Sequence, residues 1–295
     1  MWLSWQAAVQ SALLILALVG VAAVLRVRAR APRWNGPLTL ATEVSRVLVL
    51  YAVWQFTREQ TVTHTAGAME NARTLWHLER WLHLPNELSW QQAFLPHRWL
   101  MTFMDGYYAI AHIPVMGGVL VWLYWRHRDR YPLVRNILAL TTFFSVLMHM
   151  HPLAPPRMLT DLGFVDSALL LGQSVYGANG TGVSNQLAAL PSLHYAWAII
   201  GTGAVIRIST SRWRWLIVIH VVLTTLAVTV TANHWFMDGI VTIPIIAVAW
   251  AMQNAASRAM ARWWQARAPH DVAQDDEAPA MASASASEGA TSGAF

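Results

Sequence analysis

The chain has 295 residues, of which 56% are hydrophobic and only 12% are charged. Soluble domains carry about 25% charged residues, so this composition excludes an ordinary soluble protein. Apolar runs long enough to span a bilayer recur along the sequence and indicate an integral membrane protein. The net charge of +5 does not indicate nucleic-acid binding, because the arginines cluster between apolar runs as they do in cytoplasmic loops. Cysteine is absent, which excludes disulfides, thiolate metal sites and a cysteine nucleophile.

Seven apolar stretches predict membrane-spanning helices. Arginines are dense in every second connection, and the positive-inside rule then predicts an N-terminus outside the cell and a C-terminus in the cytoplasm. The stretches are residues 3–25, about 40–58, about 100–124, about 133–151, 192 to about 206, about 215–232 and 234 to about 253.

The segments between these stretches have characters of their own. Residues 63–97 predict an amphipathic helix in the membrane interface, with tryptophans at headgroup depth and Glu70, Arg73, Glu79 and Arg80 on its polar side. The Pro- and Gly-rich residues 152–191 are too long for a simple connection and indicate a functional loop.

The predicted fold class is therefore an all-α, polytopic membrane helical bundle. About seven transmembrane helices form it, namely a six-helix core and one N-terminal helix, together with the interfacial helix. We expect an N-terminal transmembrane helix at residues 1–30, a membrane catalytic domain at 40–257 and a disordered, acidic tail at 268–295. Within residues 40–58, Glu43 and Arg46 are spaced to pair on one helix face.

His234 and Asp238 are the first candidates for chemistry. Four residues apart on a helix, they lie on the same face, where the carboxylate fixes the imidazole tautomer and leaves the other ring nitrogen as a nucleophile or base. Ionisable groups at membrane depth are costly and usually functional. A structural helix pair is the alternative.

Two further segments supply candidates for binding an anion. Pro191 and Ser192 predict a helix start with Ser192 as N-cap, and the backbone amides at Ser192 and Leu193 would then form a phosphate seat beneath His194. Arg157 follows two prolines in the long loop, and arginine suits bidentate contact with phosphate oxygens. A packed histidine and a surface arginine are the alternatives.

Order, residue types and spacing of these segments resemble the type 2 phosphatidic acid phosphatase superfamily, over roughly residues 40–255. Residues 191–194, Pro-Ser-Leu-His, resemble its Pro-Ser-Gly-His motif, and residues 234–238 resemble its His-x-x-x-Asp motif. Arg157 corresponds to the arginine of the Lys-x6-Arg-Pro motif, although Met158 replaces the proline and Met150 or His151 stands near the lysine position. Val228 occupies the place of the third motif's arginine. The local sequence looks closest to the inositol phosphorylceramide synthase-like, or inositolphosphotransferase, branch.

The resemblance implies a two-step, metal-independent mechanism without a cofactor. His234 would attack the phosphorus while Asp238 orients its ring, and His194 would act as general acid and then as base. Arg157 and the amides at Ser192 and Leu193 would stabilise the phosphate oxygens. A metal site built from His149, His151 and His194 is the less favoured alternative. Candidate substrate or acceptor contacts are Asp105, Tyr108, His112, His151 and Asn185.

The leading hypothesis is a lipid phosphotransferase that moves a phospho-headgroup from a phospholipid or polyprenyl phosphate to an acceptor alcohol such as a polyol. The alternatives are a lipid phosphate phosphatase and, in another class, a non-catalytic lipid-binding or transport protein. The arginine- and alanine-rich, lysine-free composition indicates a bacterial cytoplasmic membrane, with the site on its outer side. No nucleic-acid partner is expected.

Overall fold

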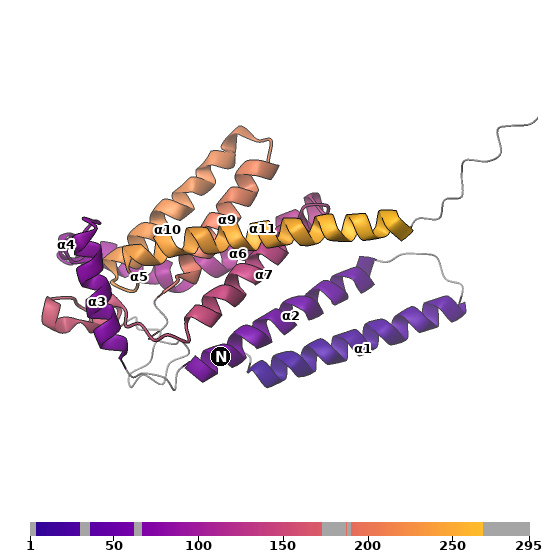
Figure 1. The fold of residues 1–295 in the computed structure, drawn as a ribbon, viewed down its shortest axis with the longest axis horizontal. Helices are drawn as coiled ribbons and strands as arrows, with labels where there is room; N and C mark the ends of the chain where they lie inside the picture. The colour runs from indigo at the N-terminus through magenta and orange to yellow at the C-terminus, as the bar shows by residue number, and fades with distance from the viewer. Residues whose placement is uncertain (1–3, 30–35, 62–66, 173–186, 188–189, 268–295) are drawn as a thin grey trace, which may run out of the picture. The chain divides into compact units, whose positions relative to one another are not determined.

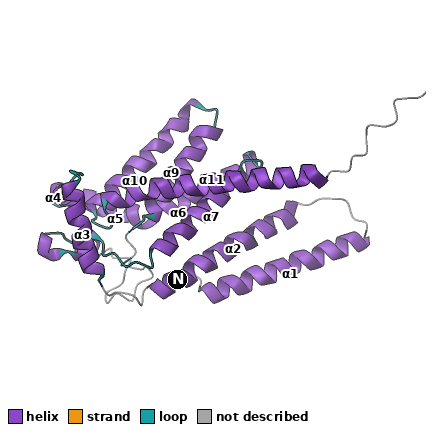
Figure 2. Ribbon diagram, in the orientation of Figure 1, coloured by secondary structure: helices purple, strands orange, loops and turns teal. Residues whose placement is uncertain are grey.

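The computed structural model of the protein describes residues 4–29, 36–61, 67–172, 187 and 190–267. Every regular element in these residues is a helix (Figure 2), which confirms the predicted all-helical class. The α-helices, labelled in Figure 1, are α1 Trp5–Ala29, α2 Gly36–Thr61, α3 Ala68–Trp81, α4 Glu87–Phe94, α5 Arg98–Ile110, α6 His112–Arg126, α7 Tyr131–Met148, α8 Ser167–Leu170, α9 Leu193–Ile208, α10 Val218–Val230 and α11 Phe236–Arg267. Three 3-10 helices are η1 Pro156–Met158, η2 Thr160–Leu162 and η3 Arg212–Ile217.

Several helices are suited to a membrane. Among the described residues, three helical segments are long and apolar enough to cross one, namely α7, Arg212–Val230 and α11. Helices α5 and α6 form a fourth candidate as a bent pair, and shorter apolar helices cover Gln6–Ala22 and α9. Helices occupy all seven predicted stretches, and the crossing of the membrane by each of them stays a prediction.

The chain divides into two compact units, Met1–Gln253 and Asn254–Phe295. The site described below belongs to the first unit. Of the second unit the structure describes residues 254–267, the last part of α11. The predicted tail, 268–295, lies outside the described residues, and the predicted domain boundaries stay predictions.

Helix α9 lies at the centre of the candidate catalytic domain. It contacts α6, α7 and α10, and α10 in turn contacts α4 and α5. Ser192 caps the start of α9, because its hydroxyl accepts the backbone N–H of Tyr195, which confirms the predicted helix start. The cap fixes the start of α9 and so places the side chain of His194 in the first turn of this helix.

The predicted span at 100–124 is bent by 46° between α5 and α6. Pro114 explains the bend, since proline has no N–H to donate to Ile110 four residues earlier and its ring clashes with that carbonyl. Helix α6 starts at His112, so this side chain lies at the bend, in the middle of the helix pair.

The amphipathic helix predicted within residues 63–97 is two helices, α3 and α4, and the prediction that Glu79 lies on the polar side is wrong. Glu79 is fully buried together with Ala68, Ala72 and Leu75, whereas Trp81 is 73% exposed. The buried positions recur every three or four residues, as one helix face requires. The carboxylate of Glu79 lies on that face because it accepts a backbone N–H group of α11, as described below.

The first of the buried apolar clusters connects α3 with the loop that follows α7 and with the turn before α11. Trp235 is its largest fully buried side chain, and Trp76 and Phe164 pack around it with ring centroids 6.1 Å from its own. The indole N–H donates to the carbonyl oxygen of Ala154 at 3.0 Å. This single side chain therefore fixes the distance between two of the segments that carry candidate site residues.

A polar cluster joins α2 to α7. Glu43 accepts hydrogen bonds from Arg46, as predicted from their spacing, and also from Arg135 of α7. Asn136, next to Arg135, donates to the side chain of Gln253 at 3.1 Å. These contacts tie helix α2 to the core. The sequence alone predicted only one of them, the pair of Glu43 and Arg46.

We predict that Trp235→Ala lowers the free energy of unfolding by about 3–5 kcal/mol, because it leaves a large cavity, whereas Trp235→Phe keeps most of the packing and loses mainly the hydrogen bond. Thermal unfolding of the purified protein in detergent measures both. Trp81→Ala, at an exposed position, is the control. Equal losses at positions 235 and 81 would contradict the assignment of Trp235 to the core.

Candidate active site

The turn between α10 and α11 presents the first candidate residues. The carbonyl oxygen of Val228 accepts the backbone N–H groups of both Asn233 and His234, at 3.1 and 3.2 Å. Ala232 adopts a left-handed conformation with φ of 52°, which ends α10 and reverses the chain. His234 therefore lies in the turn before α11, not on the helix itself as the sequence predicted.

Asp238, in the first turn of α11, holds His234. Its Oδ2 lies 2.8 Å from Nδ1 of His234 and also accepts the backbone N–H of Trp235 at 3.0 Å. Because this carboxylate oxygen accepts, Nδ1 carries the proton and Nε2 is the unprotonated ring nitrogen. Asp238 is fully buried and His234 is 5% exposed, so water competes little for this pair.

His194 lies beside this pair. The ring centroids of His194 and His234 are 5.4 Å apart. Tyr108 stacks on His194 at 4.4 Å, and His112 meets it edge-on at 4.3 Å. The α9 helix start, the bend between α5 and α6 and the α10–α11 turn thus bring three histidines and a tyrosine together.

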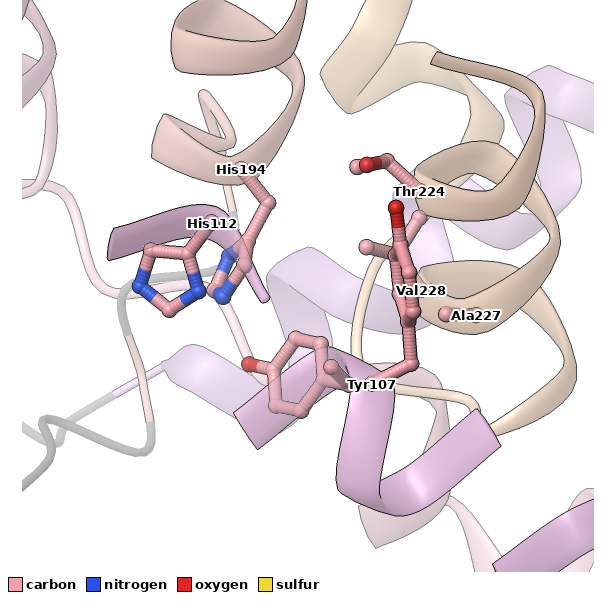
Figure 3. A pocket seen from close by; sticks show the side chains of 7 residues that line it. Tyr107, His112, His194, Thr224, Ala227 and Val228 are labelled. Carbon is pink, nitrogen blue, oxygen red and sulfur yellow. The ribbon is translucent and has the colours of Figure 1, made fainter. Parts of the chain in front are cut away.

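A pocket adjoins these rings (Figure 3). His112 and His194 line one side of it, and Thr224 and Val228 of α10 line the other. Tyr107, Tyr108 and Ala227 complete the lining. Val228 thus places an apolar side chain here at the position where the resembled motif carries an arginine.

Arg157 is buried, with 3% of its surface exposed, which makes the surface-arginine alternative wrong. Its Nη1 donates to Oδ1 of Asn233 at 2.7 Å and its Nε to Oδ2 of Asp166 at 3.2 Å. Its backbone N–H donates to the carbonyl oxygen of Ala232 at 2.8 Å. Asn233, which directly precedes His234 in the chain, therefore holds the guanidinium of Arg157 next to His234.

Thr242 links the start of α11 to the start of α9. Its hydroxyl lies 2.6 Å from the carbonyl oxygen of Asp238 and 3.4 Å from that of Ser192. Ser192 is fully buried and Leu193 partly buried. The predicted phosphate seat at the start of α9 is thus adjacent to the turn of α11 that carries Asp238.

The remaining candidate contacts separate into three groups. Tyr108 and His112 belong to the histidine cluster. Asp105 does not line the pocket, because its Oδ1 accepts the hydroxyl hydrogen bond of Ser167 at 2.9 Å and so holds α8. His151 is exposed and is not among the residues of the cluster, and Asn185 lies outside the described residues.

Sequence reasoning missed two residues that hold the site together. Asn233 positions Arg157, and its place beside His234 was the available signal. His149, weighed only as a metal ligand, lies 2.9 Å through Nε2 from the carbonyl oxygen of Pro191. Since a carbonyl only accepts, Nε2 carries the proton, and the bond ties the end of α7 to the segment before Ser192.

In the described part of the chain, no group of three or more His, Cys, Asp or Glu side chains could hold a metal ion. His149, His151 and His194 therefore do not form the metal site considered as an alternative.

Taken together, the apolar helices and the buried His–Asp pair with its neighbouring histidine and arginine define a helical membrane protein with a site suited to phosphate chemistry. A family model described as the PAP2 superfamily matches residues 73–252, which include all of these side chains, and the chain belongs to this superfamily. Comparisons with curated proteins and with solved structures give no match. Membership supports a lipid phosphatase or phosphotransferase kind of function. It does not distinguish the branch.

We predict that His149→Ala lowers the melting temperature of the protein in detergent, because it removes the hydrogen bond that ties the end of α7 to Pro191. His151→Ala, at an exposed position nearby, is the control. Equal melting temperatures for the wild type and His149→Ala would contradict this role.

Proposed function

We propose that this protein is a lipid phosphotransferase that moves a phospho-headgroup from a membrane lipid to an acceptor alcohol through a phosphohistidine on His234. The observation that carries the proposal is the Nδ1-bonded His234–Asp238 pair, with the ring of His194 5.4 Å away. A nucleophile oriented by a carboxylate, with a second histidine in reach, is the arrangement that such a displacement requires. The donor is a phospholipid or a polyprenyl phosphate.

In the first step, Nε2 of His234 attacks the phosphorus and forms the nitrogen–phosphorus bond. The bond from phosphorus to the leaving oxygen breaks, and His194 gives its proton to that oxygen. In the second step, His194 takes the proton of the acceptor hydroxyl, whose oxygen attacks the phosphorus and releases His234. Asp238 stabilises the positive charge on the His234 ring while the intermediate exists.

Charge on the phosphoryl oxygens is stabilised by Arg157 and by the start of α9. The hydrogen bonds of Arg157 to Asn233 and Asp166 fix the guanidinium before substrate binds, so little reorganisation is needed. The backbone N–H groups around Ser192 and Leu193 add the positive end of a helix dipole. Together they take the role of the basic residues of the resembled motifs, at whose positions this chain has Met150 and Val228.

Transfer to an alcohol, in preference to water, is supported by the pocket beside His194. Tyr108, His112 and Thr224 are among its lining residues, so polar side chains lie beside the general base, while the hydroxyl of Tyr107 is bonded to His220. The local sequence around Arg157 and His194, which resembles the inositolphosphotransferase branch, supports the same choice. The arginine- and alanine-rich, lysine-free composition supports a bacterial cytoplasmic membrane. The distribution of the arginines supports a site on the outer side and a C-terminus in the cytoplasm.

The test uses purified protein in detergent with labelled phospholipids and polyprenyl phosphates, each with and without inositol. We expect a new phospho-headgroup product that requires the acceptor and disappears in His234→Ala. Release of inorganic phosphate without an acceptor would instead identify a phosphatase. Equal turnover by wild type and His234→Ala would overturn the nucleophile, and absence of turnover with measurable lipid binding would favour a non-catalytic lipid-binding protein.

Three variants should separate the roles. Asp238→Asn and His194→Gln should each lower kcat by about 10²–10⁴-fold, because each impairs proton transfer or tautomer control. Arg157→Lys should lower kcat/KM, since lysine cannot replace the planar fork of donors. His77→Ala, at an exposed position of α3, is the control and should leave both constants unchanged; a loss there as large as in the site variants would contradict these roles.

The covalent intermediate should be detectable directly. With a donor whose leaving group needs no protonation, His194→Gln should still form the phosphohistidine but transfer it slowly, because the base for the second step is missing. Rapid quenching with a phosphorus-labelled donor should therefore yield acid-labile, base-stable label on His234. Label at another residue, or on His234→Ala, would contradict the mechanism.

A further inference from the structure

Two fully buried carboxylates lie outside the proposed catalytic set. Glu79 ends the buried face of α3, and Glu87 begins α4; both have 0% of their surface exposed. Burying a carboxylate is costly unless hydrogen bonds or an opposite charge replace the lost water. The contacts of these two side chains therefore indicate why they are there.

Each carboxylate accepts a backbone N–H group from the first turn of α11. Oε1 of Glu87 accepts from Phe236 at 3.0 Å, and Oε1 of Glu79 accepts from Met237 at 2.8 Å. Asp238 accepts from Trp235 in the same turn. Three consecutive N–H groups at a helix start, which have no partner within the helix, are thus satisfied by three carboxylates.

One arginine, Arg80, lies beside the carboxylates of both Glu79 and Glu87. Nη2 of Arg80 lies 3.2 Å from Oε2 of Glu87 and 3.8 Å from Oε2 of Glu79. The same guanidinium donates to the carbonyl oxygen of Pro85 and stacks over the ring of Trp76. Arg80 is therefore fixed in place, and its single positive charge balances one of the two carboxylates.

The second carboxylate is kept neutral. Burial, followed by the hydrogen bond and the negative charge of Glu87, raises the pKa of Glu79 to about 9. At neutral pH the pair therefore holds one proton. The charged groups that face it are Arg80 from α3, Glu87 from α4 and Asp238 from α11.

We propose that Glu79 and Glu87 are positioning residues for His234. Their carboxylates, which share one proton, accept backbone hydrogen bonds from α11 and so hold the start of this helix in place. His234 directly precedes the capped turn, and Asp238 lies within it, so a shift of this turn would change the direction of Nε2. The inference rests on the proposed function, because it assigns these residues to the same catalytic pair. Their action is through the backbone of Phe236 and Met237, not through contact with the substrate.

The pair should give activity an alkaline limit. As pH rises through about 9, the shared proton leaves and two buried anions face each other, which separates α3 and α4 from the start of α11. Turnover should therefore fall above this pH in the wild type. Glu79→Gln, which keeps an acceptor for Met237 and cannot ionise, should retain most of its activity at neutral pH and lose this decline.

The experiment compares Glu79→Gln, Glu79→Ala and Glu87→Ala with Glu70→Ala, an exposed glutamate on the same helix. Hydrogen–deuterium exchange of the full-length protein in detergent reports on the peptide that contains Phe236 and Met237. Turnover of a fluorescent phospholipid donor, measured with inositol as the acceptor, reports on kcat and KM from pH 6 to 10. His234→Ala is measured alongside.

We expect faster exchange of this peptide in Glu79→Ala and Glu87→Ala, and a fall in kcat of about tenfold to a hundredfold with little change in KM, because the nucleophile is misplaced. Glu70→Ala should match the wild type in both. Unchanged exchange in both alanine variants overturns the proposal, as does an alkaline decline in Glu79→Gln identical to that of the wild type. Wild-type turnover in His234→Ala would refute the proposed function instead, and the exchange data would still decide whether the carboxylates hold the helix.

Discussion

At the start of α11, several buried polar groups must find partners inside an apolar protein. A helix N-terminus leaves backbone N–H groups without partners, and in apolar surroundings each one costs free energy comparable to a lost hydrogen bond. Asp238, Glu79 and Glu87 supply the acceptors, and Asp238 also accepts from His234. The hydrogen bond that orients the candidate nucleophile is therefore part of the same network that allows the helix to begin there.

Hydrogen bonds to backbone carbonyl oxygens hold the other segments of the site. The N–H of Arg157 donates to Ala232, the indole of Trp235 donates to Ala154, and His149 donates to Pro191. Because each bond joins a segment next to a candidate site residue, the side chains are held before any substrate arrives. Such preorganisation is what electrostatic stabilisation of a phosphoryl group requires.

Residues whose partners are near in sequence were predictable, and those whose partners are distant were not. The i to i+4 spacing of His234 and Asp238 gave their contact, and the Pro191–Ser192 pair gave the start of α9. Glu79 was assigned to the polar side of α3 because its partner Met237 lies 158 residues further along the chain, where no local pattern could reveal it. Pro114 carried a readable signal for the bend between α5 and α6, whereas the role of Asn233 depends on Arg157, 76 residues away.

The distance along the chain between Glu79 and Met237 also sets an order of assembly. Helices α3 and α4 leave the ribosome long before α11, since synthesis proceeds from the N-terminus. Until α11 is made, Glu79 and Glu87 have only Arg80 and each other among the partners that they have in the folded protein. The turn that carries His234 can be completed only when the last helix arrives, so the candidate nucleophile is among the last parts of the protein to reach its final geometry.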